Sequence, residues 1–188
     1  MVQPERNIEV LWKPFSLAIK NEELNNSQKN SKFANEHKAS HRIIRIILAL
    51  NHHANISMID AYTLFGINYH IVGKKYDNKL IESVLAQKKL PATLISYADD
   101  ESLDKELTNN INEAIAIVGE DIGVPTIIFD NNGKKQGYFG PVLQELPNKE
   151  EALRLWDGLA MLASSETFYE LKRSRPKGDP NVFSTAKC

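Results

Sequence analysis

Cysteine is nearly missing from this sequence: Cys188, the last of its 188 residues, is the one cysteine. One cysteine cannot form a disulfide within the chain, and such scarcity is typical of proteins that work in a reducing cytoplasm. Cys188 is also a poor candidate for a catalytic thiol, because no helix N-terminus or fixed cation is implied beside it that would stabilise a thiolate. The sequence therefore predicts a cytoplasmic protein in which we assign no catalytic residue.

Long apolar runs and an excess of one charge are missing as well. No apolar stretch approaches 18 residues and no charged-then-apolar leader begins the chain, so we expect neither membrane insertion nor secretion. The 23 lysines and arginines stand against 24 acidic residues, and this balance gives no basic surface for nucleic acid. With 42% hydrophobic and 25% charged residues, the composition is that of one globular domain, with room for an inserted subdomain.

The most informative stretch runs from Gly119 to the end of a predicted hairpin. Gly119 follows an apolar-periodic segment and is the type of residue that closes a helix. Residues 126–129 are short, β-branched and apolar, as in a buried strand. The turn formers at 131–133 then predict that residues 138–139 return antiparallel. Pro125 lacks an N–H, which a strand tolerates at its start.

Before this hairpin the pattern is mostly helical. Residues 8–12 alternate and predict a strand that ends before Pro14. Asp77 is positioned to cap one helix and Asn148 to cap the last one. The remaining periodic segments predict helices over about 31–54, from there to about 70, and from Asp99 or Asp100 to 118. In the last helix we expect Leu155, Leu159 and Leu162 to pack on the sheet.

Several of these segments carry a family resemblance. Residues 118–126 resemble the cis-proline segment of thioredoxin-fold proteins related to the disulfide oxidoreductase DsbA, and residues 138–143 resemble the strand and bend that follow it. Four further segments resemble one cytoplasmic branch, which includes mycothiol-dependent nitroreductases and uncharacterised DsbA-like proteins; they lie at residues 8–10, 16–22, 155–157 and 168–173. The resemblance implies an α/β, thioredoxin-like fold with an all-helical insertion. The sequence alone leaves the isomer of the Val124–Pro125 bond open, since about one X–Pro bond in twenty is cis.

On this resemblance the chain divides into three parts. Residues 1–22 and 119–175 form an incomplete thioredoxin-like part, residues 23–118 form the helical insertion, and residues 176–188 form a flexible tail. The family's N-terminal strand and Cys-x-x-Cys helix are missing, because a strand, helix and parallel strand need about 30 residues and the predicted strand begins by Ile8. The missing strand would lie at the sheet centre.

Two hypotheses follow from the missing cysteine pair. In the first, the chain is a truncated member of the DsbA-like thiol–disulfide oxidoreductases, redox-inactive as it stands. In the second, it is a non-catalytic thioredoxin-like module for binding or assembly. Because an exposed central edge invites pairing, we also expect a homo-oligomer, and a monodisperse monomer in solution scattering would count against that expectation.

The resemblance also implies a substrate site. In thioredoxin folds the residue before the cis-proline binds an extended substrate through its backbone, which places substrate contacts at Val124, Pro125 and Thr126. The implied partners are a small thiol, as electron donor, and a disulfide-containing substrate. No cofactor is predicted beyond that thiol, although Lys172, Arg173 and Arg175 could attract an anionic one.

Histidine spacing raises one further alternative. His37 and His41 lie four residues apart on a predicted helix, a spacing that can place two imidazoles on one metal. Their neighbours Asn35, Lys38 and Arg42 are typical of a solvated face, and no H-E-x-x-H pattern is present. We therefore predict no metal site.

Overall fold

The computed structural model describes residues 1–24, 33–131, 133–174, 178 and 180–187, without the side chains of 185–187. The chain divides into two compact units: unit 1 is Met1–Leu11 with Glu113–Cys188, and unit 2 is Trp12–Asn112. Helices dominate, and the strands of the described residues form one two-stranded sheet. The α/β class is therefore confirmed at this coarse level. A two-stranded sheet does not confirm a thioredoxin-like fold, and the predicted division at 22/23, 118/119 and 175/176 stays a prediction.

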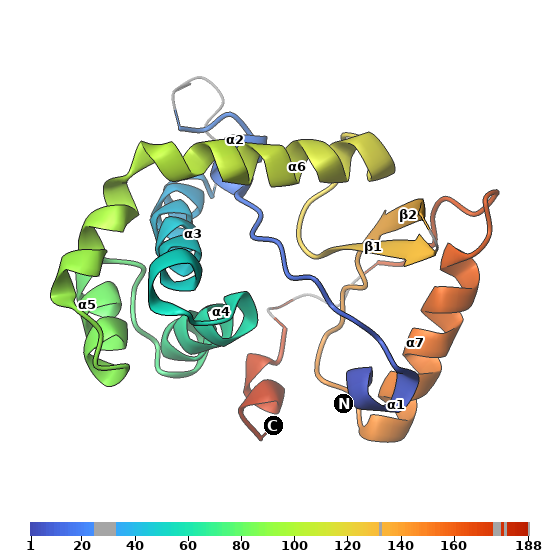
Figure 1. Ribbon diagram of the computed structural model, residues 1–188. Helices are drawn as coiled ribbons and strands as arrows, with labels where there is room; N and C mark the ends of the chain where they lie inside the picture. The colour runs from blue at the N-terminus through green and yellow to red at the C-terminus, as the bar shows by residue number, and fades with distance from the viewer. Residues whose placement is uncertain (25–32, 132, 175–177, 179, 188) are drawn as a thin grey trace. The chain divides into compact units, whose positions relative to one another are not determined.

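The two units differ in their elements (Figure 1). Unit 2 holds α2 (Leu17–Lys20), α3 (Ala34–Ala54), α4 (Met58–Gly66), the π-helical η2 (Ile67–Ile71), α5 (Asn78–Gln87), the 3-10 segments η3 (Ala92–Asp99) and η4 (Glu101–Leu103), and the start of α6 (Asp104–Val118). Unit 1 holds α1 (Gln3–Arg6), the end of α6, β1 (Thr126–Asn131), β2 (Lys134–Phe139), α7 (Lys149–Ala163) and the 3-10 segment η5 (Val182–Lys187). None of the helices in these described stretches has the length and apolarity needed to cross a membrane.

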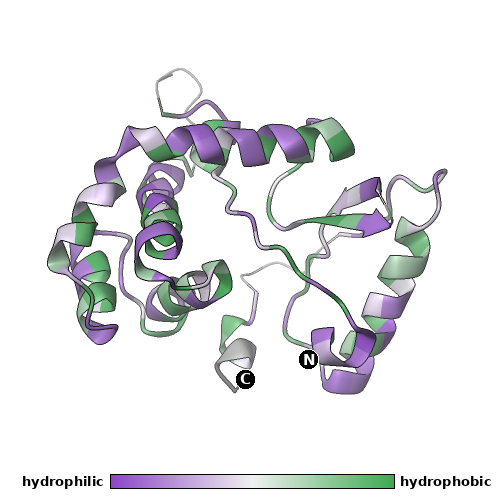
Figure 2. Cartoon of the chain, in the orientation of Figure 1, coloured by the Kyte–Doolittle hydropathy of each residue, from purple (hydrophilic) through white to green (hydrophobic). Residues whose placement is uncertain are grey.

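The core of unit 2 is built around α3, which is buried on several sides, as its apolar pattern predicted. Its core side chains meet Phe65 of α4 and the apolar stripe of α5; the buried cluster includes Ile43, Ile46, Ile47, Leu50, Leu80, Ile81, Val84 and Leu85. The same helices carry the alternation of apolar and polar residues visible in Figure 2. Burial of this stripe fixes the helices of unit 2 against one another.

Local capping signals place the helix ends in unit 2. The Asp77 carboxylate accepts a hydrogen bond from the Leu80 N–H at 3.0 Å and starts α5, as predicted. The break predicted at residue 54 is present, because Asn55 in the left-handed conformation ends α3 and Ser57 caps α4, and the helical segment predicted from there to about 70 is α4 with η2. The helix predicted from Asp99 or Asp100 begins as 3-10 turns and becomes α-helical at Asp104.

The predicted hairpin is present in unit 1. Thr126 pairs with Phe139 and Asn131 with Lys134 in an antiparallel register, and Gly119 closes α6 with a φ of 98°. Asn132 of the predicted turn lies outside the described residues. A Cβ at Gly137 would stand 2.7 Å from Val118 Cγ2, so glycine there lets the end of α6 pack closely on β2.

The strand predicted at residues 8–12 is wrong. These residues have no regular secondary structure, and Leu11 and Trp12 are 80% and 51% exposed. Alternation produces a strand only where a neighbouring strand supplies hydrogen bonds, and β1 and β2 are the strands of the chain's described part.

Helix α7 begins as predicted, with the Asn148 side chain accepting from the Glu151 N–H at 2.9 Å. Its predicted packing face is wrong at two positions, because Leu155 and Leu162 are exposed. Trp156 instead packs near Phe129 of β1, with ring centroids 5.6 Å apart. The Trp156 ring therefore covers the part of the sheet that Leu155 and Leu162 were expected to cover.

Candidate functional site

The proline loop, residues 123–126, lies at the start of β1 in unit 1 and is held from both sides. The Thr126 hydroxyl donates to the Gly123 carbonyl at 2.7 Å, and the Gly140 N–H donates to the Pro125 carbonyl at 2.8 Å. The Val124–Pro125 bond, whose isomer the sequence left open, is cis. Between these anchors the Val124 side chain is 46% exposed, so the loop presents Val124 to solvent.

The backbone around Val124 is open to a ligand. Within the described residues no hydrogen bond reaches the Val124 N–H or carbonyl. The bond from Gly140 to Pro125 makes Thr126 and Phe139 a non-hydrogen-bonded pair, so the N–H and carbonyl of Thr126 point away from β2. Such an edge can bind an extended ligand through main-chain hydrogen bonds.

Apolar side chains flank this open backbone. We call residues 123–126 together with residues 139–143 the hairpin mouth, since Thr126 pairs with Phe139 and Pro125 bonds Gly140. The exposed apolar members of the hairpin mouth are Val124, Phe139, Val142 and Leu143. This combination of free backbone donors and exposed apolar side chains suits a small ligand with a polar group on an apolar body.

A second polar cluster is buried in unit 2. The His41 cluster comprises Ser16, His41, Arg45 and Asp104. Ser16 Oγ lies 2.9 Å from His41 Nδ1, and His41 Nε2 lies 3.2 Å from Asp104 Oδ1. Arg45 donates from Nε and Nη2 to the two oxygens of Asp104 at 2.7 and 2.5 Å. Helices α2, α3 and α6 are thereby joined through charge-assisted bonds.

The electrostatics of the His41 cluster favour a neutral imidazole. Burial lowers the pKa of His41, Asp104 opposes this shift, and the nearby Arg45 cation adds to it. The Ser16 hydroxyl accepts from the Ile19 N–H at 3.3 Å as the cap of α2, and it can donate its own proton to a neutral Nδ1. The Asp104 hydrogen bond meanwhile raises the pKa of Arg45 further.

Serine, histidine and aspartate in contact can form a nucleophilic triad, but this one cannot act on a substrate. Ser16 is fully buried and His41 is 2% exposed. Nε2 of His41 faces Asp104 without meeting hydrogen-bond geometry. The cluster therefore acts as an internal link between helices.

The two histidines considered for a metal have separate partners. His37 Nδ1 lies 2.7 Å from the buried Glu23 carboxylate, whereas His41 belongs to the cluster above. No group of three metal-ligating side chains gathers anywhere in the described part of the chain. Lys172 and Arg173 lie exposed without regular structure, while Arg175 and Cys188 fall outside the described residues.

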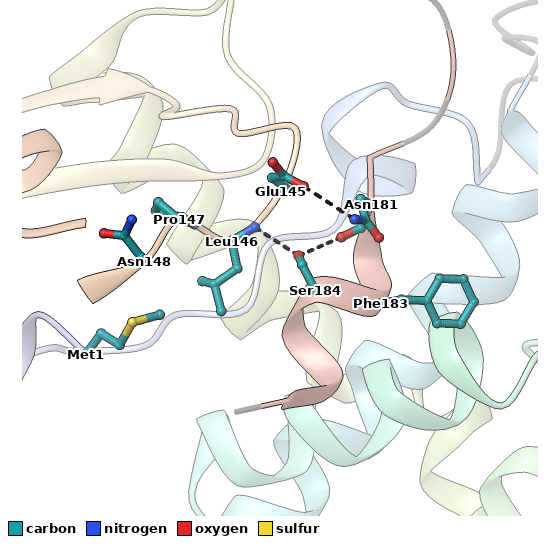
Figure 3. Close-up of a pocket in the computed structure, with 8 residues that line it drawn as sticks. All are labelled: Met1, Glu145, Leu146, Pro147, Asn148, Asn181, Phe183 and Ser184. Carbon is teal, nitrogen blue, oxygen red and sulfur yellow. Dashed lines mark hydrogen bonds between the residues drawn. The ribbon is translucent and has the colours of Figure 1, made fainter. Parts of the chain in front are cut away.

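A cavity of about 560 Å³ lies elsewhere in unit 1, lined by Met1, Glu145, Leu146, Pro147, Asn148, Asn181, Phe183 and Ser184. In Figure 3 the Ser184 hydroxyl lies between Leu146 and Asn181. It accepts from the Leu146 N–H at 2.9 Å and donates to the Asn181 carbonyl at 2.7 Å. These bonds fasten η5 of the predicted tail to the loop before α7 and use both hydrogen-bonding roles of the Ser184 hydroxyl.

Sequence reasoning missed Ser16, Arg45 and Asp104. One signal was present, since His41 and Arg45 are polar residues four apart inside the apolar pattern of α3. We assigned His41 to a solvated face with its neighbours, although residues four apart share a face and Arg45 is enclosed by isoleucines.

The amino-acid sequence is similar to known proteins over most of its length. The family model described as "Rv2466c-like: Mycothiol-dependent nitroreductase Rv2466c" matches residues 1–173. The chain is also similar to "Uncharacterized protein Rv2286c" of Mycobacterium tuberculosis (strain ATCC 25618 / H37Rv). The two are 29% identical over 187 residues, which cover 97% of this chain and 76% of the relative.

The family match corrects the assignment made from sequence. Nothing in it points to DsbA-like proteins, so the DsbA-like resemblance and the DsbA-type thiol–disulfide oxidoreductase activity are wrong. The non-catalytic module suggested as the alternative gains no support either. The resemblance went astray because hairpin and proline-loop signals describe local backbone geometry, which different families share.

Proposed function

The chain belongs to the Rv2466c-like family of mycothiol-dependent nitroreductases, and from this premise we propose that it serves in the reduction of nitro compounds by a small thiol of the mycothiol type. The match extends over residues 1–173, which include α1 to α7 and the whole hairpin mouth but not η5. A cytoplasmic location fits this proposal, since small thiols stay reduced there.

The proposed chemistry balances with two thiols for each nitro group. Each thiol gives up one electron and one proton, the two sulfurs join in a disulfide, one N–O bond breaks, and the oxygen leaves as water with a nitroso product. The described residues contain no cysteine, so the part we assign to them is to bind and orient. The electrons come from the small thiol.

The observation that carries the proposal is the open backbone at Val124. We assign substrate contacts to Val124, Pro125 and Thr126, the residues that the resemblance implied. The Val124 N–H has no partner within the described residues and can donate to a nitro oxygen. The Thr126 hydroxyl shapes the loop by donating to the Gly123 carbonyl, and the Thr126 N–H, which points away from β2, is the group that can contact the substrate.

Val124→Asp tests this assignment. An exposed carboxylate beside the N–H repels a nitro oxygen or an approaching thiolate, and we expect kcat/KM to fall about tenfold, or roughly 1.4 kcal/mol. The measurement is loss of nitro absorbance under anaerobic conditions with mycothiol and 4-nitrobenzyl alcohol. Val72→Asp is the matched control, because Val72 is an exposed valine, 60% accessible, in unit 2.

Two results would contradict the proposal. If the wild-type protein shows no thiol-dependent loss of the nitro group above the rate of mycothiol alone, the proposed reductase activity is wrong. If Val124→Asp and Val72→Asp lower the rate equally, the assignment of the substrate site to Val124 is wrong, although the protein still has the proposed activity.

A further inference from the structure

Phe139 stands apart from the other aromatic residues of the hairpin. Phe129 packs near Trp156, and the neighbouring Tyr138 packs near Phe168 with centroids 5.7 Å apart. The Tyr138 hydroxyl also donates to the Phe168 carbonyl at 2.9 Å. Within the described residues Phe139 has no aromatic neighbour in stacking range, and it is 51% exposed.

Strand parity explains where the Phe139 ring lies. Successive residues of β2 point to opposite faces, so Tyr138 turns toward Phe168 and Phe139 turns to the other face. There the ring reaches the proline loop, because a Cβ built at Gly123 would lie 3.5 Å from Phe139 Cε2. The exposed ring therefore stands directly beside the residue that precedes Val124.

We infer that Phe139 is an aromatic platform that selects nitroaromatic over aliphatic nitro compounds, an inference that rests on the proposed function. A nitro-substituted ring is electron-poor, and the face of a phenylalanine ring is electron-rich, so offset stacking between them is favourable. With its ring on Phe139, a nitroaromatic compound can direct a nitro oxygen toward the Val124 N–H. The polar and apolar halves of the hairpin mouth thus match the two halves of one ligand.

The acidic residues near the hairpin mouth indicate which ligand charge the site accepts. Glu120 and Asp121 precede the loop and are both exposed. Their carboxylates disfavour an anionic ligand, so an uncharged nitroaromatic compound such as 4-nitrobenzyl alcohol is the appropriate probe.

Binding without any thiol tests the platform separately from the reaction. By NMR titration, Phe139→Leu should raise the Kd for 4-nitrobenzyl alcohol about fivefold to tenfold, whereas Phe139→Trp should keep it within about twofold. Binding of 2-methyl-2-nitropropane, which has no ring, should be unchanged in both variants. Phe33→Leu is the matched control, since Phe33 is also 51% exposed and lies in unit 2. Circular dichroism checks that each variant is folded.

The outcomes separate the two proposals. If Phe139→Leu binds the nitroaromatic probe as tightly as the wild type does, or if the wild type does not bind it, the platform is wrong. If binding of 4-nitrobenzyl alcohol depends on Phe139 but mycothiol does not reduce the bound compound, the platform is supported and the reductase proposal is wrong. If Phe139→Leu does not fold, the wild type decides: the probe must shift the Phe139 ring resonances upfield more than 2-methyl-2-nitropropane does, and equal shifts overturn the platform.

Discussion

Arg45→Ala should lower the free energy of unfolding of the chain by about 3–5 kcal/mol, the usual cost of removing one partner of a buried ion pair. The Arg45 side chain is 9% exposed and binds both oxygens of Asp104, whose side chain is 23% exposed. Truncation leaves that largely buried carboxylate without its cation and also removes the bond from Arg45 to the Ala98 carbonyl. Urea denaturation followed by circular dichroism measures the loss.

Arg42→Ala supplies the control on the same helix. Arg42 binds Asp99 through two bonds of 2.8 Å, a geometry close to that of Arg45 and Asp104, but the two side chains are 31% and 70% exposed. Water screens this pair, and its removal should cost about 0–1 kcal/mol. Equal losses for the two variants would show that burial does not govern the strength of these pairs.

The contrast between these two arginines shows what the sequence could predict. Caps such as Asp77 and Asn148, and the helix end at Gly119, depend on residues within one turn of the chain, and each was predicted correctly. The bond between Arg45 and Asp104 joins residues 59 positions apart. No local pattern encodes that separation, so an arginine inside an apolar run could not be assigned a partner.

Non-local pairing also explains the errors in the fold. Residues 8–12 have the alternation of a strand but find no strand to pair with among the described residues, and they stay irregular. Similarly, the stripe of leucines on α7 suggested a packing face, but Trp156 took the place on the sheet and Leu155 and Leu162 stayed exposed. Which face packs depends on the shape of the opposing surface.

The candidate site was partly accessible from the sequence. The glycine, proline and β-branched pattern located the proline loop and the hairpin, because turn and strand starts have strong local signals. The exposure of Phe139 was not accessible, since it depends on which strand face Phe168 covers. Substrate contact at Val124, which the resemblance implied, stays a prediction, and no local pattern could reveal the aromatic side chain beside it.

Acid should destabilise the fold through His41. Because burial lowers the pKa of His41 in the folded protein, the unfolded chain binds the proton more tightly, and falling pH favours unfolding. The contribution is fully present above the ordinary histidine value of about 6.5 and is lost as the pH falls below it. Between pH 7.5 and 5.5 the loss is at most about 1.4 kcal/mol, set by titration of the unfolded histidine.

Two charged groups beside His41 shift its pKa in opposite directions. Asp104 on α6 attracts the proton, Arg45 on α3 repels it, and the Ser16 hydroxyl at the start of α2 is neutral. Because Arg45 occupies both oxygens of Asp104, the carboxylate is already compensated and cannot fully offset burial. Protonation of His41 therefore adds a second cation to a site built around one ion pair.

His41→Asn separates this effect from the other titrating groups. An asparagine oxygen can accept the Ser16 hydroxyl in place of Nδ1, and it does not titrate. The variant should lose most of the pH dependence between 7.5 and 5.5 while the exposed His70→Asn control keeps it, as measured by urea midpoints at each pH. If His41→Asn and the wild type lose stability in parallel as the pH falls, protonation of the His41 imidazole does not lower the free energy of unfolding, and the prediction is wrong. The cluster would then have to open to water before the helices it joins unfold.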